Sequence, residues 1–335
     1  MSPTVTDTLL SVDNLTVRFP TAYGPAYAVN HLSLRLERGK MLGIVGESGC
    51  GKSMTSLAIL RLVPTPGEIV SGSVMFDGQD LIKLSQKGIQ DIRGAKIALI
   101  PQDPLTSLNP VYTIGDQIME VLMRHQSISK KEALEKTIDL LRQVRIPNAE
   151  SRVNDYPHQF SGGMRQRAMI AMALSCKPSL LIADEPTTAL DVTVQAQILD
   201  LLKELQETHN TAILLITHDL GVVAETCDNV AVMYAGRIVE EASVFDLFQN
   251  PKHPYTKGLL HSLPTLEKIQ SKTPLEPIEG QPPALTEIPK GCAFEPRCPS
   301  RMEICTSAFP PHSLIEGKNP ASPHDVRCYL YPTPT

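Results

Sequence analysis

The stretch GESGCGKS, residues 46–53, constrains the fold of this chain more than any other feature. It has the spacing of a phosphate-binding P-loop, follows the apolar run MLGIVG (41–46) and precedes the helix-forming run MTSLAILRL. In that context loop N–H groups and the helix N-terminus face phosphate, Lys52 reaches the β- and γ-phosphates, and Ser53 ligates Mg²⁺. The alternative is a glycine-rich turn without a ligand. The residues expected to contact nucleotide here are Gly46, Ser48, Gly49, Cys50, Gly51, Lys52, Ser53 and Met54.

Two acidic residues, Asp184 and Glu185, end the apolar run SLLIAD (179–184). Ligands of open α/β sheets bind at the carboxyl ends of the strands. Because phosphoryl transfer depends on positioning and charge neutralisation, we expect Asp184 to hold Mg²⁺ through water and Glu185 to polarise the attacking water. A DE pair alone is a weak signal, but together with the P-loop it predicts an ATP-hydrolysing site.

Apolar runs alternate with helix-period segments up to about residue 240, which predicts a largely parallel sheet covered by helices. The expected buried strands are 41–46, 95–101, 179–184 and 211–217. A helical insertion is expected at about 105–165, where Ser129 and Glu132 have capping-box spacing. Of the 28 prolines, 16 fall within 251–335, so long regular elements are not expected there.

Charge and hydropathy exclude several classes of protein. The net charge is −5 and no run of five or six like charges occurs, so the basic footprint of a nucleic-acid-binding protein is missing. Neither a signal-peptide pattern nor about 18 continuous apolar residues is present. We therefore expect a cytosolic protein that does not itself cross a membrane, and in that compartment clustered cysteines more often hold metal than form disulfides.

The stretch FSGGMRQR, residues 160–167, resembles the signature motif of ABC ATPases, with Met164 where many members have glutamine. The resemblance implies that Ser161, Gly162 and Gly163 begin a helix whose N–H groups and hydroxyl contact a γ-phosphate. In the family that phosphate belongs to the ATP on the P-loop of a partner subunit. An ordinary capped helix start is the alternative.

Three further landmarks of the family follow in the family's order. Gln102 in PQDP resembles the Q-loop glutamine, which implies a place beside Mg²⁺, and Asp191 in TALD resembles the D-loop aspartate. His218 in LLITHDL resembles the switch histidine that contacts the γ-phosphate, with a buried core histidine as its alternative. The resemblance therefore implies that the catalytic residues are Glu185, His218 and Gln102.

The aromatic residue that would stack on adenine is left open by the sequence. Tyr23 lies in the region where the family has its A-loop, and Phe19 and Tyr27 compete with it. Tyr23 is the residue that we expect to stack on adenine, and a surface aromatic residue without a ligand is the alternative at each of the three positions.

Two longer stretches narrow the resemblance. QDPLTSLNPVYTIGDQI (102–118) and NPKHPYTKGLLHSLP (250–264) are similar to the ATP-binding subunits of oligopeptide and dipeptide ABC importers, a group that includes relatives for nickel and other small solutes. The resemblance implies an α/β P-loop ABC ATPase fold at 8–250, with a RecA-like core, an antiparallel β subdomain and a helical subdomain. It also implies an irregular, proline-rich C-terminal extension at 251–335.

The same resemblance implies partners and a location. The chain would lie peripherally on the cytoplasmic face of the membrane, with two transmembrane permease subunits, a second ATPase subunit that is a paralogue, and an extracytoplasmic substrate-binding protein. The alternatives are a soluble ABC ATPase that acts on nucleic acid or ribosomes, and a metabolic P-loop kinase. The acidic net charge disfavours the first, and the signature motif with His218 disfavours the second.

The extension contains three cysteines in the stretch GCAFEPRCPSRMEIC, residues 291–305. With a fourth further on, Cys292, Cys298, Cys305 and Cys328 leave gaps of five, six and twenty-two residues, which match neither C-x₂-C pairs nor the common ferredoxin runs. Spacing therefore leaves iron–sulfur, zinc and no metal open. Similar tails in dipeptide-importer ATPases imply a [4Fe–4S] cluster on these four residues.

Overall fold

The computed structural model describes residues 7–188, 190–263, 277–315 and 323–331. It consists of two compact units whose segments alternate along the chain. Unit 1 comprises Met1–Leu10, Leu36–Met41 and Met75–Thr217, and unit 2 comprises Ser11–Arg35, Leu42–Val74 and His218–Thr335, each over its described residues. None of the described helices has the length and the apolar character needed to span a membrane.

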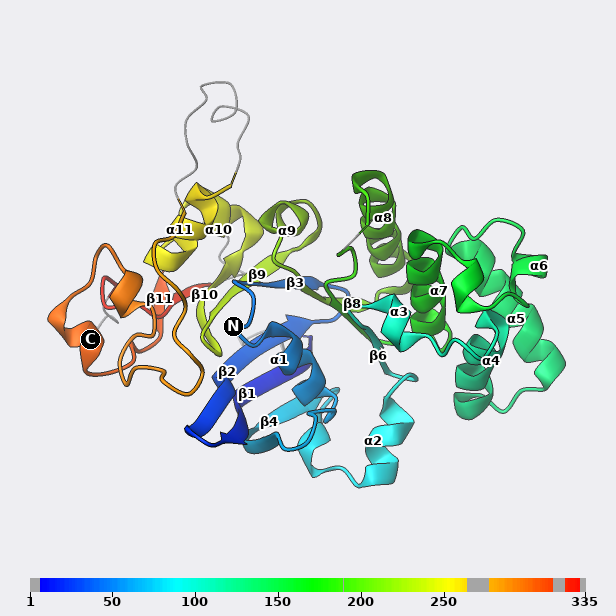
Figure 1. Cartoon of the computed structure of the whole chain (residues 1–335), viewed down its shortest axis with the longest axis horizontal. Helices are drawn as coiled ribbons and strands as arrows, with labels where there is room; N and C mark the ends of the chain where they lie inside the picture. The colour runs from blue at the N-terminus through cyan, green and yellow to red at the C-terminus, as the bar shows by residue number, and fades with distance from the viewer. Residues whose placement is uncertain (1–6, 189, 264–276, 316–322, 332–335) are drawn as a thin grey trace, which may run out of the picture. The chain divides into compact units, whose positions relative to one another are not determined.

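Unit 1 contains three parallel strands in the order β8-β7-β6 (Figure 1). Their bounds are β6 Ile97–Ile100, β7 Leu180–Asp184 and β8 Ala212–Ile216. Strands β7 and β8 are buried along their whole length, as expected for parallel strands with both faces covered. The strands predicted at 95–101, 179–184 and 211–217 are therefore confirmed to within two residues.

The predicted helical insertion is confirmed in unit 1. Its helices are α3 Pro104–Ser107, α4 Ile114–His125, α5 Lys130–Gln143 and α6 Ala149–Arg152, and α7 Gly162–Leu174 begins at its end. Helices α4, α5 and α7 pack against one another (Figure 1). The hydroxyl of Ser129 caps α5 by accepting a hydrogen bond of 3.2 Å from the N–H of Glu132, so the capping residue was correctly predicted. The rest of unit 1 includes β5 Gln79–Asp80, α2 Gln86–Ile92 and α8 Val192–His209.

Unit 2 contains strands in the order β11-β12-β10-β9-β3. Strand β3 (Met41–Val45) runs parallel to β9 (Asn229–Tyr234), and the pairs from β9 to β11 are antiparallel. Strand β10 is Arg237–Ser243, while β11 (Ser313–Ile315) and β12 (His324–Val326) come from the proline-rich extension. Periodicity did not predict these two three-residue strands. The helices of this unit are α1 Lys52–Ile59, α9 Leu220–Thr226, α10 Val244–Gln249 and α11 Pro254–His261.

A second sheet has the order β2-β1-β4-β5. Strands β1 (Thr8–Thr21), β2 (Gly24–Glu37) and β4 (Glu68–Phe76) lie mostly in unit 2, and β1 and β2 are joined by a two-residue connection, as in an antiparallel hairpin. This sheet corresponds to the β subdomain that the family resemblance implies.

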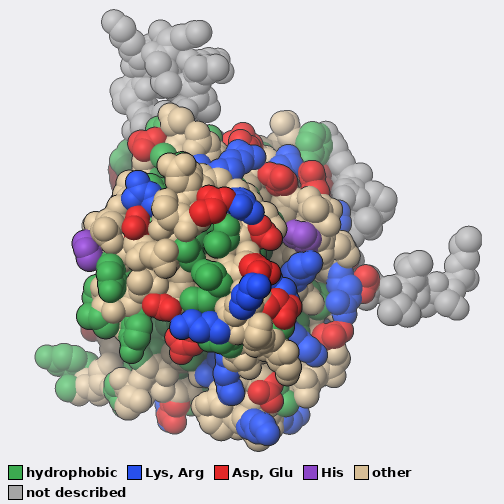
Figure 2. All heavy atoms as spheres, turned by 90° about the vertical axis from the view of Figure 1, so that its right-hand side faces the viewer, with side chains coloured by type: hydrophobic (Ala, Val, Ile, Leu, Met, Phe, Trp, Pro, Cys, Tyr) green, Lys and Arg blue, Asp and Glu red, His purple; other side chains and the backbone are tan. Residues whose placement is uncertain are grey.

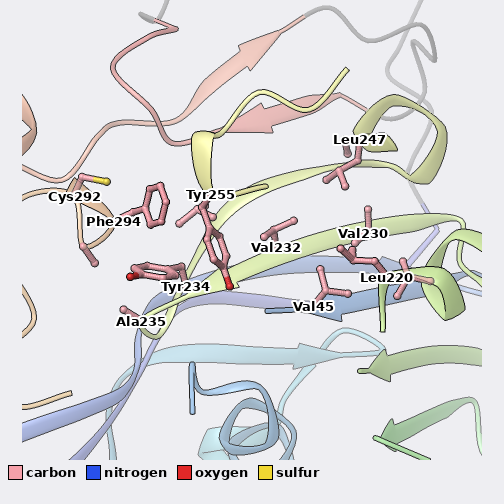
Figure 3. Packing of buried hydrophobic residues seen from close by; sticks show 14 of the residues in the cluster. Val45, Leu220, Val230, Val232, Tyr234, Ala235, Leu247, Tyr255, Cys292 and Phe294 are labelled. Atoms are coloured by element: carbon pink, nitrogen blue, oxygen red, sulfur yellow. The ribbon is translucent and has the colours of Figure 1, made fainter. Parts of the chain in front are cut away.

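The C-terminal extension shares one hydrophobic cluster with the strands of unit 2. Tyr234 of β9, Tyr255 of α11 and Phe294 of the extension are nearly completely buried in it (Figure 3). Cys292 and Cys305 belong to the same cluster. The described part of the extension is therefore packed into unit 2, while residues 264–276, 316–322 and 332–335 of the predicted extension lie outside the described residues.

Candidate functional site

The P-loop lies in unit 2 between β3 and α1, where the sequence predicts it. Lys52 is 5% exposed, and its ammonium donates hydrogen bonds to the carbonyl oxygens of Gly46, at 2.7 Å, and Glu47, at 3.1 Å. Gly51 has a φ of 108°, and a Cβ there would lie 2.1 Å from the carbonyl oxygen of Ala28. Only glycine fits that position, so the loop curves tightly around its lysine and presents an ammonium at the start of a helix.

The other P-loop residues differ in exposure. Ser48 and Gly49 are exposed at the tip of the loop, and Ser53 and Met54 are half-buried in the first turn of α1. Cys50 is buried, and burial raises the pKa of its thiol. A buried, protonated thiol suits a space-filling residue, so any nucleotide contact at this position comes from the backbone N–H.

The acidic end of β7 lies in unit 1. Asp184 is buried, and Glu185 has a φ of 46°, a conformation that non-glycine residues rarely adopt outside functional sites and turns. One carboxylate oxygen of Glu185 accepts hydrogen bonds of 2.9 Å from the Gln102 amide and of 2.9 Å from the Thr188 hydroxyl. The structure therefore brings Gln102 and Glu185 together from positions 83 residues apart in the chain.

The signature segment forms the start of α7. Ser161 is the N-cap, and its hydroxyl accepts a hydrogen bond of 3.3 Å from the N–H of Met164. Ser161 and Gly162 are exposed, while a Cβ on Gly163 would lie 2.8 Å from Val194 of α8. Asp191 is the N-cap of α8, with a hydrogen bond of 3.0 Å from the N–H of Val194. The capping residues Ser161 and Asp191 are therefore exposed at the two helix starts, while Gly163 lets α7 pack closely against α8.

His218 and the candidate adenine-stacking residues lie in unit 2. His218 is exposed directly after β8, so its interpretation as a buried core histidine is wrong. Tyr23 is 91% exposed in the turn between β1 and β2, whereas Phe19 and Tyr27 are half-buried. The Phe19 ring lies against Gly67, where an added Cβ would approach it to 2.5 Å. Of the three aromatic residues, Tyr23 has the ring most accessible to a ligand.

The four cysteines of the extension lie near one another, and none of them forms a disulfide. The N–H of Cys292 donates a hydrogen bond of 2.8 Å to the carbonyl oxygen of Cys305. The pKa of Cys292 is raised to about 11, mainly by burial and to a smaller extent by the nearby thiols of Cys305, Cys328 and Cys298. Over the ranges that the structure describes, no group of three or more His, Cys, Asp or Glu side chains is arranged to hold a metal ion.

Sequence reasoning missed three residues around the P-loop: Glu47, Tyr255 and Arg297. The Glu47 carboxylate is paired with the guanidinium of Arg297, and its N–H donates a hydrogen bond of 2.9 Å to the Tyr255 hydroxyl. The available signals were an acidic residue at a variable P-loop position and an arginine beside Cys298. Nothing in the sequence joins residues 250 positions apart, so only folding reveals this pair.

One face of the molecule shows how charge is distributed. In Figure 2, Lys and Arg side chains are interspersed with Asp and Glu side chains, and no large area has a single sign. This face therefore lacks the continuous positive surface on which nucleic-acid binding depends.

Comparisons with known proteins agree with this geometry. Residues 29–188 match the ABC transporter family, and residues 239–305 match the C-terminal region of oligopeptide/dipeptide transporters. The chain is 51% identical over 317 residues to the oligopeptide transport ATP-binding protein OppD of Salmonella typhimurium. The aligned residues cover 95% of this chain and 94% of that protein. It is 50% identical over 323 residues to the dipeptide transport ATP-binding protein DppD of Bacillus subtilis, with 96% and 94% covered.

Solved structures give the same result for the fold. A dimeric bacterial ABC transporter cassette matches with a TM-score of 0.64 at 27% identity, over 70% of this chain and 98% of that chain. The chain thus belongs to the ABC transporter family of ATP-binding proteins, and the predicted ABC ATPase fold is confirmed. Within that family its similarity to oligopeptide and dipeptide transport ATP-binding proteins confirms the narrower resemblance that the sequence indicates.

Proposed function

We propose that this chain is the ATP-hydrolysing subunit of an ABC importer for dipeptides, oligopeptides or a related small solute. The observation that carries the proposal is the extent of the similarity. Relatives that are 50% to 53% identical and named for peptide transport cover 90% to 97% of the chain. The similarity includes the C-terminal region at 239–305 as well as the ATP-binding part. A nucleic-acid-acting ABC ATPase or a metabolic kinase gains no support from these relatives.

The chain's own residues divide the chemistry between them. Lys52 and the loop N–H groups bind the β- and γ-phosphates of ATP, because the helix N-terminus and the buried ammonium both attract negative charge. Mg²⁺, when bound, neutralises phosphate charge, and Ser53, Gln102 and Asp184 are the residues that would hold it. Glu185 polarises the attacking water, and the Gln102 amide orients its carboxylate through the 2.9 Å hydrogen bond.

The site is completed by a second ATPase subunit. Ser161 and Gly162 are exposed at the start of α7, so their N–H groups are available to the γ-phosphate of ATP bound by the partner. Gly163 allows the close approach of α7 to α8 that supports this helix end. Asp191 lies at the start of α8. His218 contacts the γ-phosphate, and the exposed ring of Tyr23 stacks on adenine.

The proposed domains and location follow from the same function. The nucleotide-binding domain spans 8–250, with its helical subdomain at about 105–165, and the importer-type extension spans 251–335. The chain associates peripherally with the cytoplasmic face of the membrane through two transmembrane permease subunits. A paralogous ATPase subunit and an extracytoplasmic substrate-binding protein complete the complex, and nucleic acid is not a partner.

We also propose that Cys292, Cys298, Cys305 and Cys328 hold a [4Fe–4S] cluster, with zinc as the alternative. Three of the thiols, those of Cys292, Cys298 and Cys305, pack in one cluster, and all four are close enough to influence one another electrostatically, which supports the choice of ligands. Their present arrangement is not that of a ligand set, so binding requires the thiols to approach one another. Metal binding must also deprotonate thiols whose pKa is raised by burial, which makes the affinity strongly dependent on pH.

Co-purification and nucleotide binding test the transport function. Tagged full-length chain, expressed with the genes that neighbour its own, is expected to copurify with two hydrophobic subunits. Lys52→Ala is expected to lose ATP binding in the purified chain, because it removes the phosphate-binding ammonium. Purification without hydrophobic partners, together with association with RNA or ribosomes, would replace the importer by the nucleic-acid alternative.

Metal analysis tests the cysteine proposal. Chain purified without oxygen is expected to be brown and to contain about four iron atoms, since four thiolates hold one such cluster. Cys298→Ser is expected to lose this iron. Stoichiometric zinc would select the alternative, and four alkylatable thiols without metal would reject both.

A further inference from the structure

Glu47, the second residue of the P-loop, is held by three different groups. Its N–H donates to the Tyr255 hydroxyl at 2.9 Å, its carbonyl oxygen accepts from the Lys52 ammonium at 3.1 Å, and its carboxylate pairs with Arg297. Tyr255 comes from α11 and Arg297 from the cysteine segment. Two elements of the region after residue 250 therefore contact the same residue of the P-loop.

The Arg297 side chain is fixed by all of its nitrogen atoms. Its two terminal nitrogens donate to the two carboxylate oxygens of Glu47 at 2.7 Å and 3.0 Å. The same group donates to the Tyr234 hydroxyl at 3.2 Å and to the carbonyl oxygens of Glu279 at 2.9 Å and Ile278 at 3.3 Å. Only 5% of the side chain is exposed, compared with 28% for Glu47. A bidentate, buried pair of this kind fixes position as well as charge.

Three aromatic rings pack around the ion pair of Glu47 and Arg297. The ring centroids of Tyr234 and Tyr255 lie 4.6 Å apart, and that of Phe294 lies 5.4 Å from each (Figure 3). The Arg297 guanidinium carbon lies 5.8 Å from the centroid of Phe294 and 5.9 Å from that of Tyr234. Because Phe294 lies between Cys292 and Arg297 in the chain, its buried ring connects the cysteine segment to the site of the guanidinium.

Charge gives this contact a consequence for ATP. A carboxylate within a phosphate-binding loop repels an anionic ligand unless a cation neutralises it. Arg297 supplies that cation, since a guanidinium remains charged in proteins. Arg297 also restrains the loop, so that its backbone N–H groups already have the orientation that phosphate binding requires.

We propose that Arg297 is a positioning residue for ATP binding, which neutralises and anchors Glu47 so that the cysteine-bearing extension holds the P-loop in its phosphate-binding conformation. Tyr255 assists by accepting the hydrogen bond from the Glu47 N–H. The proposal rests on the proposed function, because it assigns a second layer of residues to the same ATP site.

A matched control lies four residues further along the same segment. The Arg301 side chain is 68% exposed, and its nearest acidic partner, Glu295, is 4.0 Å away. Arg301→Met therefore removes the same charge from the same segment without touching the P-loop. A general effect of charge on ATP binding would appear in both variants, whereas loss of positioning appears only at Arg297.

The experiment measures MgATP affinity of the purified full-length chain by equilibrium dialysis. Arg297→Met is expected to weaken binding about tenfold or more, since it leaves the Glu47 carboxylate unpaired beside the phosphates. Adding Glu47→Gln to Arg297→Met is expected to restore most of the affinity, because the unpaired charge is removed. Arg301→Met is expected to bind like wild type.

Each outcome decides the proposal. Wild-type affinity in folded Arg297→Met, an equal loss in Arg301→Met, or no recovery in the double variant would overturn it. If Arg297→Met does not fold, Arg297→Lys decides: it keeps the charge without the bidentate geometry, so affinity below wild type supports the proposal and unchanged affinity overturns it. Failure of wild type to bind ATP, or normal binding by Lys52→Ala, would instead reject the proposed function itself.

Discussion

Two glutamates in the ATPase motifs are held in different ways, Glu185 in unit 1 and Glu47 in unit 2. Glu185 accepts hydrogen bonds of 2.9 Å from a neutral amide, Gln102, and a neutral hydroxyl, Thr188. Glu47 forms a bidentate ion pair with Arg297, with nitrogen–oxygen distances of 2.7 Å and 3.0 Å. Neutral hydrogen-bond donors orient a carboxylate without neutralising its negative charge, whereas a guanidinium neutralises most of that charge.

The difference matches the roles that we propose for the two positions. A carboxylate that polarises water must keep its negative charge, and a loop that receives anionic phosphates must not present one. The same residue type thus serves opposite needs because the two units supply different partners. Four measurements test or sharpen this comparison.

The two glutamine substitutions are expected to give the largest contrast. Glu185→Gln should slow ATP hydrolysis in the assembled transporter by about 10²-fold or more, in the range expected for losing a general base. Glu47→Gln should stay within about fivefold of wild type, since it exchanges one hydrogen-bonded partner of Arg297 for another. Similar losses in both variants would show that the two carboxylates do not differ in role.

Gln102→Glu is expected to have the next largest effect, about tenfold on hydrolysis at pH 7. It places a second carboxylate 2.9 Å from Glu185, so one of the two retains a proton to higher pH. The pH–rate profile should therefore move to higher pH in Gln102→Glu. Gln102→Ala, which adds no charge, should leave the profile where it is, and an unshifted profile in both would show that Gln102 does not contact the base.

His253 is expected to make unit 2 sensitive to acid. Its Nδ1 caps α11 by accepting a hydrogen bond of 3.1 Å from the N–H of Tyr255, and burial lowers the pKa of His253 to about 4. Between about pH 6.5 and 4 the unfolded chain binds a proton that the folded chain does not, so stability falls as the pH falls through this range. The apparent Tm should drop by on the order of 5 °C from this group.

His253→Asn is the matched variant for that measurement. Asparagine keeps an acceptor for the helix cap and does not titrate, so the Tm of this variant should depend less on pH between 6.5 and 4. An identical slope in both proteins would assign the acid sensitivity to other groups.

Two of the capping serines of unit 1, at the starts of α7 and α5, are expected to give the smallest effects. Ser161 and Ser129 each accept a hydrogen bond from an N–H three residues on, at 3.3 Å and 3.2 Å. Ser161→Ala and Ser129→Ala should each cost about 1 kcal/mol of stability, as for other N-caps. Only Ser161→Ala should also slow hydrolysis, and only in the assembled transporter, where we propose that a second subunit's ATP faces α7. A loss of activity in both variants would reduce the role of Ser161 to capping.

Local patterns account for most of what was predictable. Lys52 follows an apolar strand and begins a helix, and a P-loop needs only this local order of elements to form. The strand before Asp184 and the cap at Ser129 were predicted for the same reason, since periodicity and capping act over a few residues. The short strands β11 and β12 escaped prediction because three residues carry no readable period.

The sequence by itself determined the motifs, their order and the family, because each motif is a short run whose chemistry requires those residues at that spacing. Only the tertiary structure decided which partner each acidic side chain has. Gln102 reaches Glu185 across 83 positions and Arg297 reaches Glu47 across 250. Such pairs depend on how strands and helices pack, and packing is set by the burial of the whole core, which no short stretch of sequence specifies.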